Sequence, residues 1–202
     1  MSMNPEFLEE FWGVGGGVQV GPGGGGSIEH VGDFSVEDGP RIEIDPLPAG
    51  YDRFVIFLEF TNLAETAGTP LAQIGTAANS NPNTDVGINT HSVTVSDIPA
   101  RSHIGTTQTT NRFFLTANDA NAQLDSGGLW QGVLNVDFPG DATRGPRFSL
   151  RGGYAPAVGN YAASHGSAIY DDANRVTILH IEITPSTNLT GTARVFGYPS
   201  AS

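Results

Sequence analysis

The sequence of 202 residues contains no cysteine and no lysine. Without cysteine the chain has no disulfide, no thiol nucleophile and no cysteine-rich zinc site. Without lysine it has no Schiff-base amine and no P-loop lysine, because all nine basic residues are arginine. These absences exclude several large enzyme classes. They leave the compartment open, because a chain without cysteine is indifferent to the redox state around it.

Positive charge and long apolar runs are also scarce. The chain has 21 acidic and nine basic residues, which gives a formal net charge of −12. Such an excess argues against binding to nucleic-acid phosphates or to an anionic membrane surface. No stretch approaches the ~20 apolar residues of a membrane span, and the N-terminus lacks the basic start of a signal peptide. We expect synthesis in a cytoplasm, with no membrane insertion and no nucleic-acid partner.

The N-terminal stretch is rich in large apolar side chains. Asn4 and Pro5 make a good helix start, and Gly13 is a natural helix stop. Helical spacing places four apolar residues on one stripe: Phe7, Leu8, Phe11 and Trp12. The residues from 13 to 26 are mostly glycine and have the composition of a flexible linker. The expected organisation is an anchor helix over 1–12, a linker over 13–26 and a β domain over 27–202.

After residue 26 the sequence pattern changes to short strands. Segments such as "DRFVIFLEF" and "RVTILHIEIT" are rich in β-branched and aromatic residues, and Gly, Pro, Asn or Asp separates most of the segments. No segment has the pattern of a helix longer than about two turns. The pattern predicts an all-β sandwich or barrel with these two segments, the longest apolar runs, as central strands. In the second segment Ile178, His180 and Glu182 share one face, while alternation on the other face has one break.

Motifs for catalysis and cofactor binding are weak. Gly21, Gly23 and Gly26 spell G-x-G-x-x-G, but a strand-like segment follows where a dinucleotide site needs a helix. Asp125-Ser126-Gly127 matches the aspartic-protease triplet only once and is also a good hairpin turn. Asp- and Asn-rich loops have calcium-type oxygens without the EF-hand pattern. Five histidines lack metal-motif spacing: His30, His91, His103, His165 and His180. We expect no enzyme activity, no metal and no cofactor.

Two stretches resemble a group of bacteriophage virion proteins. Residues 27–63 contain "DFSVEDGPRIEIDPLPAGYDRF", and residues 175–198 end in "GTARVFGY". They resemble the opening strands and the closing hairpin of small head-fibre, head-spike and tail-fibre proteins, although Phe196 stands where that pattern often has tyrosine. The layout of a short N-terminal segment, a glycine tether and one β domain is similar too. The resemblance implies a jelly-roll-like antiparallel β-sandwich on a virion surface, usually oligomeric, and we favour a trimer.

This resemblance suggests a role for the apolar N-terminal stripe. Its four side chains would lie in a groove of a capsid or tail protein, as helix-in-groove ligands do. The tether would then let the β domain stand away from the particle. Two alternatives stay open at this point: the segment packs back on its own sandwich, or it is disordered.

Adhesion to a host-surface glycan would require exposed aromatic side chains. The candidates are Trp130, Tyr154, Tyr161 and Tyr170. Trp130 lies in the strand-like segment "GLWQGVLNV", so a core position is the alternative for its side chain. A stand-alone carbohydrate-binding module is therefore the second functional hypothesis. A capsule depolymerase is the third, although no catalytic motif supports it.

Overall fold

The computed structural model describes most of the chain beyond the glycine-rich stretch. The described residues are 27–76, 88–96, 101–105, 112–116, 123–137, 139, 145–155, 162–170, 175–185 and 188–200. Only the backbone is described at 76, 88–96, 101–105 and 170. Every regular element in these ranges is a β-strand. The same ranges contain no helix that is long and apolar enough to cross a membrane. The expected anchor helix and linker, residues 1–26, lie outside the described residues.

The described residues form twelve strands, and most of them are short, as the sequence predicts. In chain order they are β1 (Glu29–Gly39), β2 (Arg41–Ile44), β3 (Tyr51–Asn62), β4 (Thr69–Thr76), β5 (Ile88–Ser96), β6 (Arg101–Gly105), β7 (Arg112–Phe114), β8 (Leu129–Asp137), β9 (Arg147–Tyr154), β10 (Ala162–Tyr170), β11 (Val176–Thr184) and β12 (Leu189–Pro199). All of the strand pairings are antiparallel.

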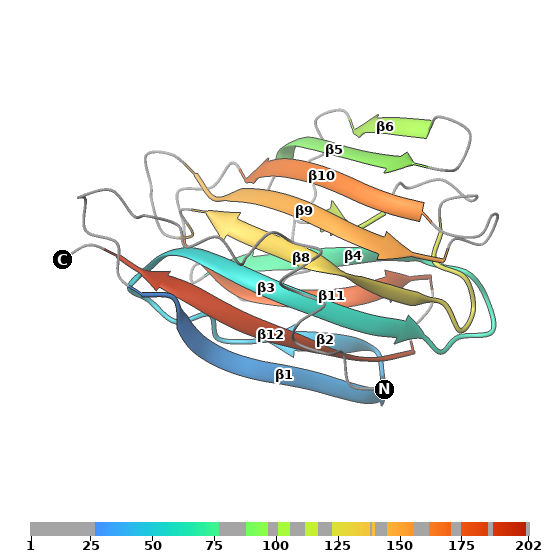
Figure 1. Cartoon of the computed structure of the whole chain (residues 1–202), viewed down its shortest axis with the longest axis horizontal. Coiled ribbons are helices and arrows are strands. Elements are labelled where there is room, and N and C mark those ends of the chain that lie inside the picture. The colour runs from blue at the N-terminus through green and yellow to red at the C-terminus, as the bar shows by residue number, and fades with distance from the viewer. Residues whose placement is uncertain are drawn as a thin grey trace.

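The strands form two sheets that pack face to face. The larger sheet has the order β1-β12-β3-β8-β9-β10-β5-β6, and the smaller sheet has the order β2-β11-β4-β7. In Figure 1 the larger sheet lies in front, with strands of the smaller sheet behind it. The inner faces of the sheets share one core of buried apolar side chains. This arrangement confirms the prediction of an all-β sandwich.

Strand β3 has the clearest alternation of buried and exposed residues. Its inward side chains are Phe54, Ile56, Leu58 and Phe60, and none is more than 3% exposed. Neighbours β12 and β8 pair with it on either side. Strand β11 lies between β2 and β4 in the smaller sheet. Both segments with long apolar runs are therefore interior strands, as predicted.

Strand β11 is buried on both of its faces. Leu179 and Ile181 point into the core with no exposed surface. Ile178 and His180, on the opposite face, are only 7% and 6% exposed. A register shift against β4 lies between Val176 and Ile178. This shift accounts for the break in alternation that the sequence contains at this point.

Strand β1 forms one edge of the larger sheet among the described strands. It pairs with β12 over most of its eleven residues. The pairing has two register shifts, one between His30 and Gly32 and one between Val36 and Gly39. These irregularities interrupt the hydrogen-bond ladder along a strand whose other side has no paired neighbour in the described sheet.

The indole of Trp130 occupies the inner face of the larger sheet. It has no exposed surface and stacks on Phe60, with ring centroids 5.3 Å apart and an interplanar angle of 13°. Gly132 on β8 and Gly152 on β9 lie directly opposite each other and against the ring. A side chain at either glycine would overlap the indole, so the glycines provide the space that the ring needs.

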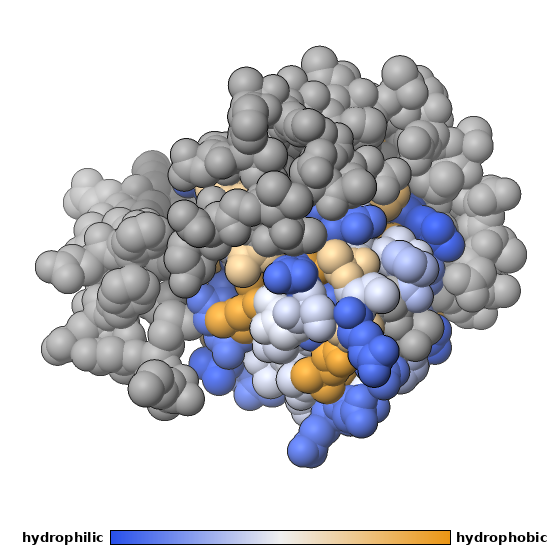
Figure 2. Space-filling model, turned by 90° about the vertical axis from the view of Figure 1, so that its right-hand side faces the viewer, coloured by the Kyte–Doolittle hydropathy of each residue, from blue (hydrophilic) through white to orange (hydrophobic). Residues whose placement is uncertain are grey.

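Exposed apolar side chains are few among the described residues. Figure 2 views one end of the sandwich and shows hydrophobic residues in separate patches among hydrophilic ones. The large apolar side chains with substantial exposure are Ile28, Phe57, Leu63, Leu129, Ile169 and Tyr198. Scattered exposure of this kind is ordinary for a folded domain. A binding surface would instead be a place at which several exposed apolar side chains meet.

The packing around Trp130 predicts the effect of one methyl group. Gly152→Ala should lower the free energy of unfolding by about 1–3 kcal/mol, because its Cβ overlaps the indole. Gly153→Ala is the matched control, since its Cβ would meet only the Ala162 carbonyl at 3.8 Å. Urea unfolding of both variants measures the difference. Equal stability of the two variants would contradict the packing described here.

Candidate functional site

Two of the four aromatic candidates for sugar stacking lie in the core. Trp130 is fully buried and Tyr154 is 3% exposed, and the two residues are direct cross-strand partners. Burial raises the pKa of the Tyr154 hydroxyl well above its ordinary value. Neither ring is on the surface, where a sugar would stack. Tyr161 lies outside the described residues, and Tyr170 is described only by its backbone in β10.

The other sequence motifs are placed as follows. The apolar stripe of the expected anchor lies outside the described residues: Phe7, Leu8, Phe11 and Trp12. Asp125, Ser126 and Gly127 form a turn, with the Ser126 amide donating to Asp125 Oδ1 at 2.9 Å. Gly127 has a φ of 69°, and Ser126 Oγ donates to the Ala64 carbonyl at 2.7 Å. The D-S-G triplet is therefore a structural turn, as its alternative interpretation predicts.

An apolar cluster lies on the outer face of the larger sheet, which faces the viewer in Figure 1. It consists of outward residues from β3, β8 and β12 and is called here the aromatic patch: Val55, Phe57, Val133 and Phe196. Phe57 is 38% exposed, and the other three are partly exposed. The rings of Phe57 and Phe196 meet edge to face, with centroids 5.7 Å apart at 87°. Four outward apolar side chains therefore meet at one place on the sheet.

Arginine residues border the aromatic patch on both sides. Phe57 lies opposite Arg194 of β12 on one side and Val133 of β8 on the other. Val133 in turn lies opposite Arg151, whose own neighbour is His165. One row across the sheet therefore has an apolar centre between two guanidinium groups. Arginine beside aromatic rings is a common arrangement for noncovalent recognition.

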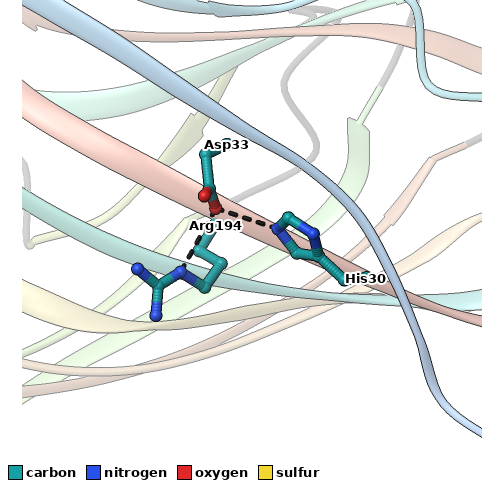
Figure 3. Close-up of polar contacts among 3 residues, drawn as sticks. All are labelled: His30, Asp33 and Arg194. Carbon is teal, nitrogen blue, oxygen red and sulfur yellow. Dashed lines mark hydrogen bonds and ion pairs between the residues drawn. The ribbon is translucent and has the colours of Figure 1, made fainter.

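A small polar network holds the border of the patch near β1. Figure 3 shows Asp33 between His30 and Arg194. His30 Nε2 lies 3.0 Å from Asp33 Oδ1, and Arg194 Nε donates to the same oxygen at 3.2 Å. These contacts, chiefly the one with His30, hold the pKa of Asp33 below its usual value. The His30 ring also contacts Phe196, with centroids 5.4 Å apart, so the network and the patch are continuous.

A second polar group lies on the outer face of the smaller sheet, at Gln73, His180 and Glu182. Gln73 Nε2 donates to Glu182 Oε1 at 2.6 Å, and Gln73 lies opposite His180 across β4 and β11. Burial raises the pKa of Glu182, although Arg112, Arg41 and the Gln73 hydrogen bond act against that rise. These side chains are shielded from solvent, so their role in the described structure is packing and hydrogen bonding.

The sequence alone does not predict the aromatic patch. Its signal is the segment "VIFLEF", in which apolar residues occupy both faces of one strand. The other members come from strands far along the chain, and only the register of β3 with β8 and β12 brings them together. A local pattern does not contain that register, which is set by the packing of the whole sandwich.

The shifted pKa of His180 should make the stability of the fold depend on pH. Burial, and then the nearby positive charge of Arg41, lower the pKa of His180, while Glu43 and Asp45 act in the opposite direction. The unfolded chain therefore binds a proton more readily than the folded chain once the pH falls below about 6.5. The free energy of unfolding should fall by up to about 1.4 kcal/mol per pH unit there.

The His180→Gln variant should lose this part of the pH dependence. Urea unfolding at about pH 7.5 and about pH 5.5 provides the measurement. His165→Gln is the control, because it replaces a histidine that is exposed on β10. A His180→Gln protein with the full wild-type slope would contradict the assignment.

Within the described ranges no three His, Asp or Glu side chains are grouped so that they could hold a metal ion. The aromatic patch has an apolar centre with an arginine on each side, and one of these, Arg194, is paired with Asp33. Comparison with protein-family models, with curated proteins and with solved structures found no match.

Proposed function

We propose that residues 27–200 form a jelly roll with two inserted strand pairs. The supporting observation is the nesting of its strand pairs, in which β1 pairs with β12, β2 with β11, β3 with β8 and β4 with β7. Folding such a nested series of eight strands over itself yields the two four-stranded sheets of a jelly roll. The remaining strands, β9-β10-β5-β6, extend the larger sheet beyond β8.

The function that we favour is supported by this architecture together with the sequence resemblance. The chain is a non-enzymatic component of a bacteriophage virion surface, either a head spike or fibre or a tail-tip protein. Its N-terminal segment anchors it to a capsid or tail protein, and its β domain is displayed for adhesion to a host. Jelly rolls occur widely in viral capsid and lectin domains. The nested pairing is the observation that carries the proposal, together with the sequence resemblance.

The competing hypothesis of a stand-alone carbohydrate-binding module has less support. It depends on exposed aromatic rings. Both candidates whose side chains are described are buried: Trp130 has no exposed surface and Tyr154 is 3% exposed. Adhesion to a glycan remains part of the virion proposal through other surfaces. Electron microscopy of the protein's natural assembly distinguishes the two hypotheses, because only a virion component would be part of a particle.

The anchor is tested on purified particles. The double change Phe11→Ala and Trp12→Ala should release the chain from its particle, because each aromatic truncation in a desolvated groove typically costs about 2–4 kcal/mol. Two changes are needed because several tethered copies add avidity. Val18→Ala with Val20→Ala in the linker is the matched control. Mass spectrometry of gradient-purified particles counts the copies, and a full complement of the aromatic double variant would refute the anchor.

The oligomer is tested in solution. We propose a trimer with closed cyclic symmetry, because surface appendages gain avidity from several copies. Light scattering at micromolar concentration should give a trimer mass for the full chain. The same measurement on a chain that begins at Ser27 shows whether the β domain is sufficient. A monomer in both measurements would contradict the proposal.

A further inference from the structure

The aromatic patch is an exposed apolar site that no described element covers, and the chain carries a segment that matches it. We propose that, before the chain meets a particle, its residues Glu6–Trp12 dock on the aromatic patch of the same molecule. The patch is then a binding surface for an acidic, aromatic helix. This inference concerns the free chain and goes beyond the proposed anchoring, since it holds whether or not a particle is present.

Apolar complementarity is the first argument. The patch offers the exposed edge of Phe57, 38% of whose surface is accessible, beside the ring of Phe196. The segment offers four large apolar side chains at helical spacing: Phe7, Leu8, Phe11 and Trp12. A helix of about two turns is too short to be stable alone in water, so it needs an apolar surface to pack against. Aromatic rings that meet at such a surface gain edge-to-face contacts.

Charge complementarity is the second argument. Four of the nine arginines lie on the outer face of the larger sheet: Arg53, Arg147, Arg151 and Arg194. Two of them form ion pairs on that face, Arg53 with Asp137 and Arg194 with Asp33. The segment contains three glutamates: Glu6, Glu9 and Glu10. At about 100° per residue, two of them border the apolar stripe on its two sides, Glu9 on one and Glu10 on the other. Arg151 and Arg194 border the patch in the same way.

Reach is the third argument. Strand β1 forms the edge of the sheet that carries the patch, and His30 near its start contacts Phe196 of that patch. The patch spans β12, β3 and β8, which are the next three strands. Strands lie about 4.8 Å apart, so its centre is roughly 10 Å from β1. A chain of fourteen residues with the glycine-rich composition of 13–26 would have a root-mean-square span of about 20 Å if it behaved as a flexible linker, which is enough.

A second copy of the β domain fits this surface less well. The patch consists of four side chains, whereas a stable interface buries about 800 Å² on each partner. A segment of seven residues with flanking glutamates fits a site of this size.

Tryptophan fluorescence tests the docking, because the chain has only two tryptophans and Trp130 is fully buried. The difference between the native chain and Trp12→Phe isolates the emission of Trp12. We expect this emission to be blue-shifted and protected from acrylamide at low protein concentration. Phe57→Ser should abolish the protection. Leu129→Ser is the matched control, since Leu129 is 40% exposed on the outer face of the same sheet but outside the patch.

A charge exchange gives a second test that leaves the apolar patch intact. Arg151→Glu with Arg194→Glu should reduce the protection of Trp12, and adding Glu9→Arg with Glu10→Arg should restore it. High salt should weaken the native docking, since charges are screened beyond about 3 Å at 1 M. Rescue by the exchange distinguishes docking from a general loss of stability.

Three outcomes would overturn the inference. The first is that Trp12 in the native chain proves as accessible to acrylamide as free tryptophan. The second is that Leu129→Ser removes the protection as completely as Phe57→Ser does. The third is that protection appears only as the protein concentration rises. The last outcome would assign the contact to a neighbouring copy. None of these outcomes affects the counting of chains on particles, so a failure here is distinct from a failure of the anchor.

Discussion

The stack of Trp130 on Phe60 is the contact on which the arrangement of the inner face depends. The indole needs flat space that only residues without side chains provide, and Gly132 and Gly152 supply it on two adjacent strands. These positions are cross-strand partners, so the contact fixes the register of β8 against β9 as well as that of β8 against β3. Since side-chain direction alternates along a strand, that register also determines which residues face outward. The aromatic patch is thus a consequence of the packing beneath it.

The fold class and the interior strands were predictable, and the site was not. The apolar runs in β3 and β11 are long enough to require burial, and the D-S-G triplet has the local chemistry of a turn. The sequence leaves open whether the side chain of Trp130 is buried or exposed, because its strand contains glycines that also suit a loop. Tyr154 was misplaced for the same reason: Gly152 and Gly153 before it resemble a turn, whereas Gly152 makes room for the indole. Local pattern does not reveal a glycine's distant neighbour.

The two outer faces of the sandwich differ in kind. On the smaller sheet the outward side chains of Ile178 and His180 are nearly as well buried as the inward ones of β11, and Gln73 donates a hydrogen bond to Glu182. On the larger sheet the outward side chains stay accessible, and apolar, cationic and anionic groups alternate in rows. Polar pairs keep most of that face hydrated. In one of them Gln131 Nε2 donates to Glu59 Oε2 at 2.8 Å. The exposed apolar cluster therefore lies on the larger sheet.

The irregular edge strand β1 has a consequence for crowding. A straight strand at the border of a sheet offers a template for the next molecule, and chains held close together at high density are at risk of growing into fibrils. Here the ladder of β1 is shifted at His30–Gly32 and again near its end, and Asp33 and Arg194 place charges beside it. An incoming strand finds no continuous row of donors and acceptors to extend. The shifts in β1 therefore lower the tendency of neighbouring copies to pair through this border.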